Sequence, residues 1–144
     1  MKINVCEYVG HVMFYPGISK EEFESYLCID DYTIHRMNEI DNLTEKYIRL
    51  VRVDMRRLEE CYCVVCLLAS TMEKVVYEEF EKLRKKSPKE YDVTFRKWVE
   101  EAGLNWDWDL FSRSIIVNEI VHWCEDNEIE YEVKPLFEYH YECY

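Results

Sequence analysis

The chain has 144 residues, 49% of them hydrophobic and 15% aromatic, which is enough to bury a core in one domain or in two small ones. Only three glycines and three prolines are present, which favours long helices over a fold of many short strands. The net charge is −12, with −10 on residues 59–144, which argues against a uniformly basic nucleic-acid-binding domain and leaves any DNA contact to the near-neutral residues 1–58.

The N-terminal part begins without a signal peptide, and the chain contains no apolar run of 18 residues. We therefore expect a cytoplasmic protein that does not span a membrane. Apolar side chains between residues 3 and 15 predict a first amphipathic helix, which ends before Pro16 and Gly17 because a helix does not readily cross this pair.

Residues 18–40 predict two short helices separated by a tight turn. Ser19 and Glu22 have the spacing of a capping box for the first helix, and Asp30 or Asp31 can cap the second. Two helices joined by a turn of three or four residues form the helix-turn-helix motif, whose second helix can lie in the major groove of DNA.

This stretch resembles the helix-turn-helix of Cro/C1-repressor-type (XRE-like) regulators, which are common in phages and mobile elements. The resemblance covers about 25 residues and is carried by Ser19, Phe23, Leu27, Ile29, Asp30, Thr33, Ile34 and Arg36. Two positions depart from the family pattern, with Glu24 in place of a small residue and Cys28 in place of the turn glycine. Glu24 then needs either exposure or an ionic partner, because burial of a lone carboxylate is costly.

The resemblance implies a dimeric, sequence-specific DNA-binding regulator. Base contacts would come from Tyr32, Thr33, His35 and Arg36, and phosphate contacts from Lys20 and from Arg49, Arg52 and Arg56. The three arginines form one stripe if residues 44–58 are a helix, as their apolar periodicity indicates. The same stripe could instead pair with the acidic part of the protein, either within one chain or between subunits, and the position of the negative charge slightly favours this pairing.

The middle of the chain predicts further helices. Residues 61–86 indicate one long or kinked helix, which is suited to a dimer seam, and Ser87-Pro88-Lys89-Glu90 is a capping box with proline at the first helical position. That helix runs to Ala102 with Gly103 as its C-terminal stop, and Asn105 opens another that runs to about Cys124.

The C-terminal residues change period. Apolar and acidic residues alternate over residues 129–133 and again over residues 137–143, which predicts two short strands. The expected fold is therefore mainly α, with a helix-turn-helix domain over residues 1–58, a long connecting helix, and an acidic helical domain over residues 59–144 that ends in two strands.

Acidic and aromatic residues of the second part suggest a protein-binding surface. The candidates are Trp106, Asp107, Trp108, Asp109, Glu128, Glu130 and Glu132. The two tryptophans are also explained as core aromatics at a helix start. An acidic field attracts basic partners, so the alternative function is an inhibitor that occupies the nucleic-acid-binding surface of a host nuclease, as anti-CRISPR or DNA-mimic proteins do.

The seven cysteines show no pattern that requires a metal. Cys63 and Cys66 could form half of a zinc site with His122 and Cys124, or with His140 and Cys143. However, Cys61 to Ala69 is a continuous apolar run, so buried, reduced thiols are the simpler interpretation and no metal is expected. No catalytic motif is present, so we predict neither an enzyme nor a cofactor.

Overall fold

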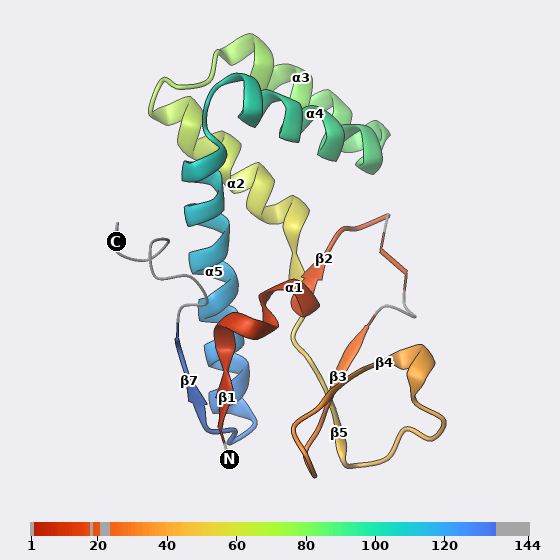
Figure 1. Ribbon diagram of the computed structural model, residues 1–144. Helices are drawn as coiled ribbons and strands as arrows, with labels where there is room; N and C mark the ends of the chain where they lie inside the picture. Colours follow the sequence, from red (N-terminus) through yellow and green to blue (C-terminus); the bar gives the residue numbers. More distant parts are fainter. Residues whose placement is uncertain (1, 18, 21–23, 135–144) are drawn as a thin grey trace. The chain divides into compact units, whose positions relative to one another are not determined.

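The computed structural model describes residues 2–17, 19–20 and 24–134 and is mainly helical with a few short strands (Figure 1). The chain forms two compact units. Unit 1 contains residues 1–13, 20–53 and 114–144, and unit 2 contains residues 14–19 and 54–113. This division differs from a boundary at residue 58, because the C-terminal residues belong with the N-terminal ones.

Unit 2 is built from helices. They are α2 (Met55–Leu68), α3 (Lys74–Lys86), α4 (Pro88–Glu101) and the first part of α5 (Asn105–Asp126). Their apolar faces enclose one core, made of Tyr62, Cys63, Cys66, Met72, Phe80, Tyr91, Phe95 and Val99. Four of these side chains are aromatic, so ring packing dominates the interior of this unit.

The helix signals between residues 87 and 124 are confirmed. Ser87 caps α4, where its Oγ accepts a hydrogen bond from the amide of Glu90 at 3.4 Å, and Pro88 opens the helix. Gly103 follows the end of α4 with φ +70°, as a C-terminal stop requires. The single element expected over residues 61–86 is instead two helices, because the chain turns at residues 69–73, where Ser70 has φ +64°.

Two glycines of unit 2 have left-handed backbone conformations, and they allow a matched prediction. A Cβ on Gly103 would meet nothing within 4 Å, whereas a Cβ on Gly17 would lie 2.9 Å from Cγ of Pro88. We expect Gly103→Ala to lower the free energy of unfolding by about 1 kcal/mol, the cost of a left-handed alanine. Gly17→Ala should cost clearly more in urea unfolding, because the rigid proline ring has to move. Equal losses would contradict the contact with Pro88.

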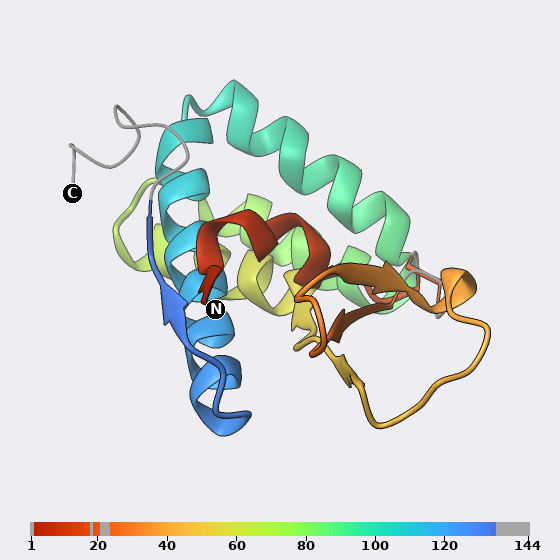
Figure 2. The same cartoon turned by 60° about the horizontal axis from the view of Figure 1, so that its bottom comes forward.

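Unit 1 combines short strands with helical turns. Its N-terminal segment contains β1 (Ile3–Asn4), η1 (Val5–Tyr8) and α1 (Val9–Val12), and β1 pairs in parallel with β7 (Tyr131–Glu132). Figure 2 shows this pair from a second direction.

A three-stranded antiparallel sheet of unit 1 has the order β4 (Ile34–Arg36), β3 (Ser25–Cys28), β5 (Tyr47–Arg49), and β4 leads into η3 (Met37–Glu39). Two further strands, β2 (Met13–Phe14) and β6 (Val53–Asp54), contain two of the four points where the chain passes from one unit to the other.

The helix-turn-helix expected over residues 18–40 is not confirmed in the described part of that stretch, whereas Glu22 and Phe23 lie outside the described residues. Residues 25–28 are the central strand of the sheet, and all four are buried. Residues 34–36, which would lie in the reading helix, form the neighbouring strand. The expected helix over residues 3–15 is likewise only partly present, since helical turns cover residues 5–12 and strands lie on both sides.

The physical reason lies in the side chain of Asp31. It accepts hydrogen bonds from the amide and the hydroxyl of Thr33, at 3.1 and 2.6 Å. An aspartate that bonds the amide two residues later satisfies a helix N-terminus and a tight turn equally well. Here it closes the β3–β4 turn, in which Tyr32 takes φ +57° and its amide donates to the carbonyl of Cys28.

The helix expected over residues 44–58 is also wrong for most of its length. Tyr47–Arg49 is strand β5, paired with β3 in the register Tyr26 to Arg49, and the helix begins only at Met55. The strand predicted over residues 129–133 is confirmed at Tyr131–Glu132, although its partner is β1. The other predicted strand, over residues 137–143, lies outside the described residues.

Within the described part of the chain, no helix combines the length and the apolar character that crossing a bilayer requires.

Candidate partner-binding surface

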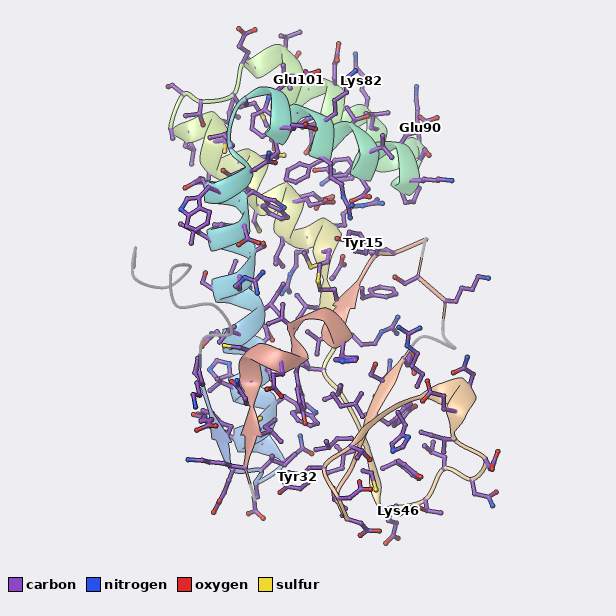
Figure 3. All side chains as sticks on the ribbon, in the orientation of Figure 1. Tyr15, Tyr32, Lys46, Lys82, Glu90 and Glu101 are labelled. Carbon is purple, nitrogen blue, oxygen red and sulfur yellow. The ribbon has the colours of Figure 1, made fainter. Side chains whose placement is uncertain are left out.

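Four predicted DNA-contacting residues lie on the β3–β4 hairpin of unit 1. Thr33 and His35 bond each other, with Oγ1 and Nε2 2.7 Å apart, and the His35 ring packs edge-on against Tyr47 at a centroid distance of 5.8 Å. Tyr32 is half-buried in the turn and Arg36 is exposed at the sheet edge. Figure 3 shows Tyr32 and Lys46 at the same end of this sheet. The four side chains therefore sit on strands and a turn, where no helix is available to enter a major groove.

The predicted arginine stripe is divided. Arg49 and Arg52 both donate to Oε1 of Glu24, each at 2.9 Å, and the Glu24 side chain is only 12% exposed. Glu24 thus has the ionic partners that its position requires. Arg56 belongs to unit 2, where its guanidinium lies 5.2 Å from the centre of the Tyr91 ring and donates to the carbonyl of Arg84 at 3.5 Å. Lys20, the remaining candidate, is exposed.

The aromatic and acidic group at the start of α5 is partly a core feature. Trp108 packs against Phe95 at a centroid distance of 4.9 Å and against Tyr62 at 5.3 Å. Asp107 accepts a hydrogen bond from the hydroxyl of Tyr62 at 2.5 Å, and Asp109 lies 3.4 Å from Arg113. Trp106 is 44% exposed. Of the two tryptophans, Trp108 is explained by packing and Trp106 remains on the surface.

Among the described residues, the densest run of exposed carboxylates along the sequence lies in residues 125–132 of unit 1, here named the acidic segment. It contains five acidic residues and no basic one, namely Glu125, Asp126, Glu128, Glu130 and Glu132. The first four are exposed, and Glu132 pairs with Lys2 at 3.4 Å. Unlike the start of α5, the exposed members of this segment have no cation paired to them in the contacts that the structure records.

The backbone of the acidic segment is fixed by its neighbours. Ile129 is only 6% exposed and anchors the segment in the core of unit 1. The amide of Ile3 donates to the carbonyl of Glu130 at 3.0 Å, and β7 follows in register with β1. The side chain of Asn4 then bonds both the amide and the carbonyl of Lys134, at 3.1 and 3.0 Å. The carboxylates therefore project from an ordered chain, which limits the entropy lost on binding.

The negative charge of the protein is divided unevenly between its two units, as it is between its sequence halves. The residues of unit 1 include 7 Lys+Arg and 17 Asp+Glu, a net charge of −10, whereas those of unit 2 include 11 and 13, a net charge of −2. A surface field of one sign raises the encounter rate with partners of the opposite sign. Unit 1 is thus the acidic part of the molecule.

No family model, curated protein or solved structure matches this chain. Its function must therefore be inferred from its own surfaces and buried groups.

The most unusual buried group is Glu59 in unit 2, which is 2% exposed. Its carboxyl hydrogen-bonds to Asp92 on α4, and Arg96 donates to Asp92 at 3.3 Å and to the hydroxyl of Tyr15 at 3.0 Å. Burial and the adjacent negative charge of Asp92 raise the pKa of Glu59 to about 9, against the smaller opposing effects of Arg96 and Arg56. Glu59 is therefore protonated at neutral pH and can donate its proton to Asp92.

Sequence reasoning missed this residue, although a signal was present. The buried face of α2 consists of Met55, Leu58, Glu59, Tyr62, Cys63 and Cys66. Glu59 is the only residue of this buried face that belongs to a charged type, at a position where the helical spacing predicts an apolar side chain. Perturbed carboxyls are often found in active sites, but this one is covered on α2 and serves to join α2, α4 and the segment containing Tyr15.

The cysteines are described in part. Cys63, Cys66 and Cys124 are buried, and His140 and Cys143 lie outside the described residues. Among the residues that the structure describes, no three His, Cys, Asp or Glu side chains converge as metal ligands would.

Proposed function

We propose that this protein is a non-enzymatic binding protein whose acidic unit 1 occupies the nucleic-acid-binding surface of a basic partner protein. The observation that carries the proposal is the acidic segment, in which four exposed carboxylates with no basic residue between them in the sequence project from a backbone held by β1 and Asn4. Carboxylates in such an array can take the places of phosphates against Lys- and Arg-rich walls.

The DNA-binding regulator, which was the first function predicted from the sequence, depended on a reading helix and on a stripe of arginines. Residues 25–28 and 34–36 are strands, and Arg49 and Arg52 are paired with Glu24. The nearby hairpin also carries Asp30 and Asp31, which repel phosphate. No specific observation now favours a regulator over an acidic binding protein, so we do not propose it as a second function.

Competition with DNA tests the proposal. A fluorescent DNA duplex bound to protamine, an arginine-rich probe, should be released when this protein is added at low salt, and less so as salt rises. Replacing Glu125, Asp126, Glu128 and Glu130 by their amides should weaken this displacement by about tenfold or more, because these exposed charges face the partner.

The matched control removes the same number of charges from unit 2, as Glu73→Gln, Glu78→Gln, Glu79→Gln and Glu100→Gln, all at exposed positions. It should retain most of the displacement activity. If both variants lose the same activity, net charge alone explains binding and the acidic segment is not the surface. A mobility shift of the duplex by this protein without protamine would instead support direct DNA binding.

A further inference from the structure

An apolar stripe runs along the outer face of α2 in unit 2. Cys61, Val64, Val65 and Leu68 occupy positions i, i+3, i+4 and i+7, which lie on one side of a helix, and all four are exposed. Val64 and Val65 are 41% and 48% exposed and Leu68 is 80% exposed. The opposite face of α2 already forms the core, so this helix is apolar on two sides. A second apolar face on a surface helix indicates a partner.

The stripe borders a groove of about 440 Å³ between α2 and α3. Its lining residues are Arg57, Glu60, Cys61, Val64, Val65, Tyr77, Glu81 and Arg84. The charges at its edge compensate one another, since Arg84 lies 3.1 Å from Glu81 and 3.8 Å from Glu60. A strongly charged ligand therefore gains little here, and the groove suits an uncharged side chain.

The outer face of α2 itself carries an uncharged side chain that could fill this groove. Leu68 protrudes two turns after Cys61 and is not among the residues that line the groove. If two α2 helices pack antiparallel about a two-fold axis between Val64 and Val65, Leu68 of each copy lies opposite Cys61 of the other. The protruding leucine then enters the hollow end of the groove, as a knob enters a hole. We infer that the occupant is a second copy of this chain, bound through an antiparallel α2–α2 contact.

Charge favours the antiparallel direction. In a parallel pair, Arg57 would face Arg57 and Glu60 would face Glu60 of the second copy, which is repulsive. In the antiparallel pair, Arg57 of one copy lies over the turn that follows α2 in the other copy. Glu73 is the one charged residue of that turn, positions 69–73, so the two opposed charges attract each other. The arrangement is self-complementary, as a two-fold interface requires.

The contact is small. A stable interface covers about 800 Å² on each partner, and one helix face with its groove supplies only part of that area. We therefore expect reversible dimerisation with a Kd on the order of micromolar. This inference does not depend on the proposed function, and it would give the dimer two acidic units.

Disulfide formation tests both the contact and its direction. Cys61 is the exposed one among the described cysteines, so the tests use a Cys143→Ser background to exclude the thiol outside the described residues. Under mild oxidation this background should remain monomeric on non-reducing gels, because Cys61 faces Leu68. Adding Leu68→Cys should give a covalent dimer, since a disulfide needs Cα atoms about 4.4–6.8 Å apart. Further replacement of Cys61 by serine should abolish that dimer.

Other outcomes would overturn the inference. A covalent dimer of the background protein through Cys61 would indicate parallel helices, and absence of any Leu68→Cys dimer would exclude the contact. Sedimentation equilibrium provides the second measurement. Val64→Lys should raise the dimerisation Kd by at least about tenfold because it buries a charge, while Val93→Lys, at an exposed position of α4, should leave the Kd unchanged. Equal effects of the two variants would contradict the α2 interface.

Discussion

Phe95→Ala is expected to lower the free energy of unfolding by about 3–5 kcal/mol, which is the usual cost of removing a fully buried phenylalanine. Phe95 has no exposed surface and lies at the centre of the unit 2 core. Its ring contacts the rings of Tyr62, Phe80, Tyr91, Trp98 and Trp108, on three other elements and on α4 itself. Truncation removes all of these contacts at once and leaves a cavity that rigid aromatic neighbours cannot fill. Urea unfolding followed by circular dichroism measures the loss.

Val93→Ala is the matched control, because Val93 lies on the same helix and is 59% exposed. We expect it to change the free energy of unfolding by less than about 0.5 kcal/mol. A loss below about 1 kcal/mol for Phe95→Ala would mean that the ring is not enclosed as described, and that α4 does not pack on α2 through this residue.

Glu59→Gln is expected to stabilise the protein, and increasingly so as the pH rises. In the folded state the pKa of Glu59 is raised to about 9, whereas in the unfolded chain it has its ordinary value near 4.5. Between these values unfolding releases a proton, so the wild-type protein loses stability as pH increases, by up to about 1.4 kcal/mol per pH unit. Glutamine keeps the shape and a donor toward Asp92 but does not titrate. The difference between variant and wild type should therefore widen from pH 5 to pH 9.

Chemical denaturation at pH 5, 6, 7 and 8 measures this difference. Glu78→Gln, at an exposed position of α3, is the control and should show a small difference that does not change with pH. A constant difference for Glu59→Gln would show that Glu59 is ionised in the folded state. Its partners Asp92, Arg96, Arg56 and Tyr15 are unchanged in the variant, so the pH dependence reports on Glu59 itself.

The second half of the chain could be predicted well because its signals are local. Ser87, Pro88 and Gly103 mark the ends of α4 by satisfying or ending its backbone hydrogen bonds, and Asn105 marks the start of α5. These residues act within a few positions of themselves. The helices predicted in the first half were wrong because an aspartate followed by a threonine two residues later makes the same local hydrogen bonds at a helix start and in a β-turn, as Asp31 and Thr33 do here.

The candidate site shows the same contrast. The acidic residues Glu128, Glu130 and Glu132 were visible as an alternating pattern, and their strand was predicted. The backbone contacts that hold this strand against Ile3 and Asn4 were not predicted, because the N-terminal and C-terminal segments are more than 120 residues apart in the sequence. Arg49 and Arg52 appeared as part of a helical stripe, whereas both are paired with Glu24, some 25 residues earlier.

The sequence by itself determined the net charge of −12, the helices from Ser87 onward and the 49% share of hydrophobic residues that is available for burial. Only the tertiary structure decided that residues 25–28, 34–36 and 47–49 are strands, that Glu59 lies buried against Asp92, and that the acidic C-terminal residues join the N-terminal ones in unit 1. The reason is physical. Helix ends and charge depend on neighbouring residues, whereas strand pairing and the burial of a carboxyl depend on partners that the chain brings together only when it folds.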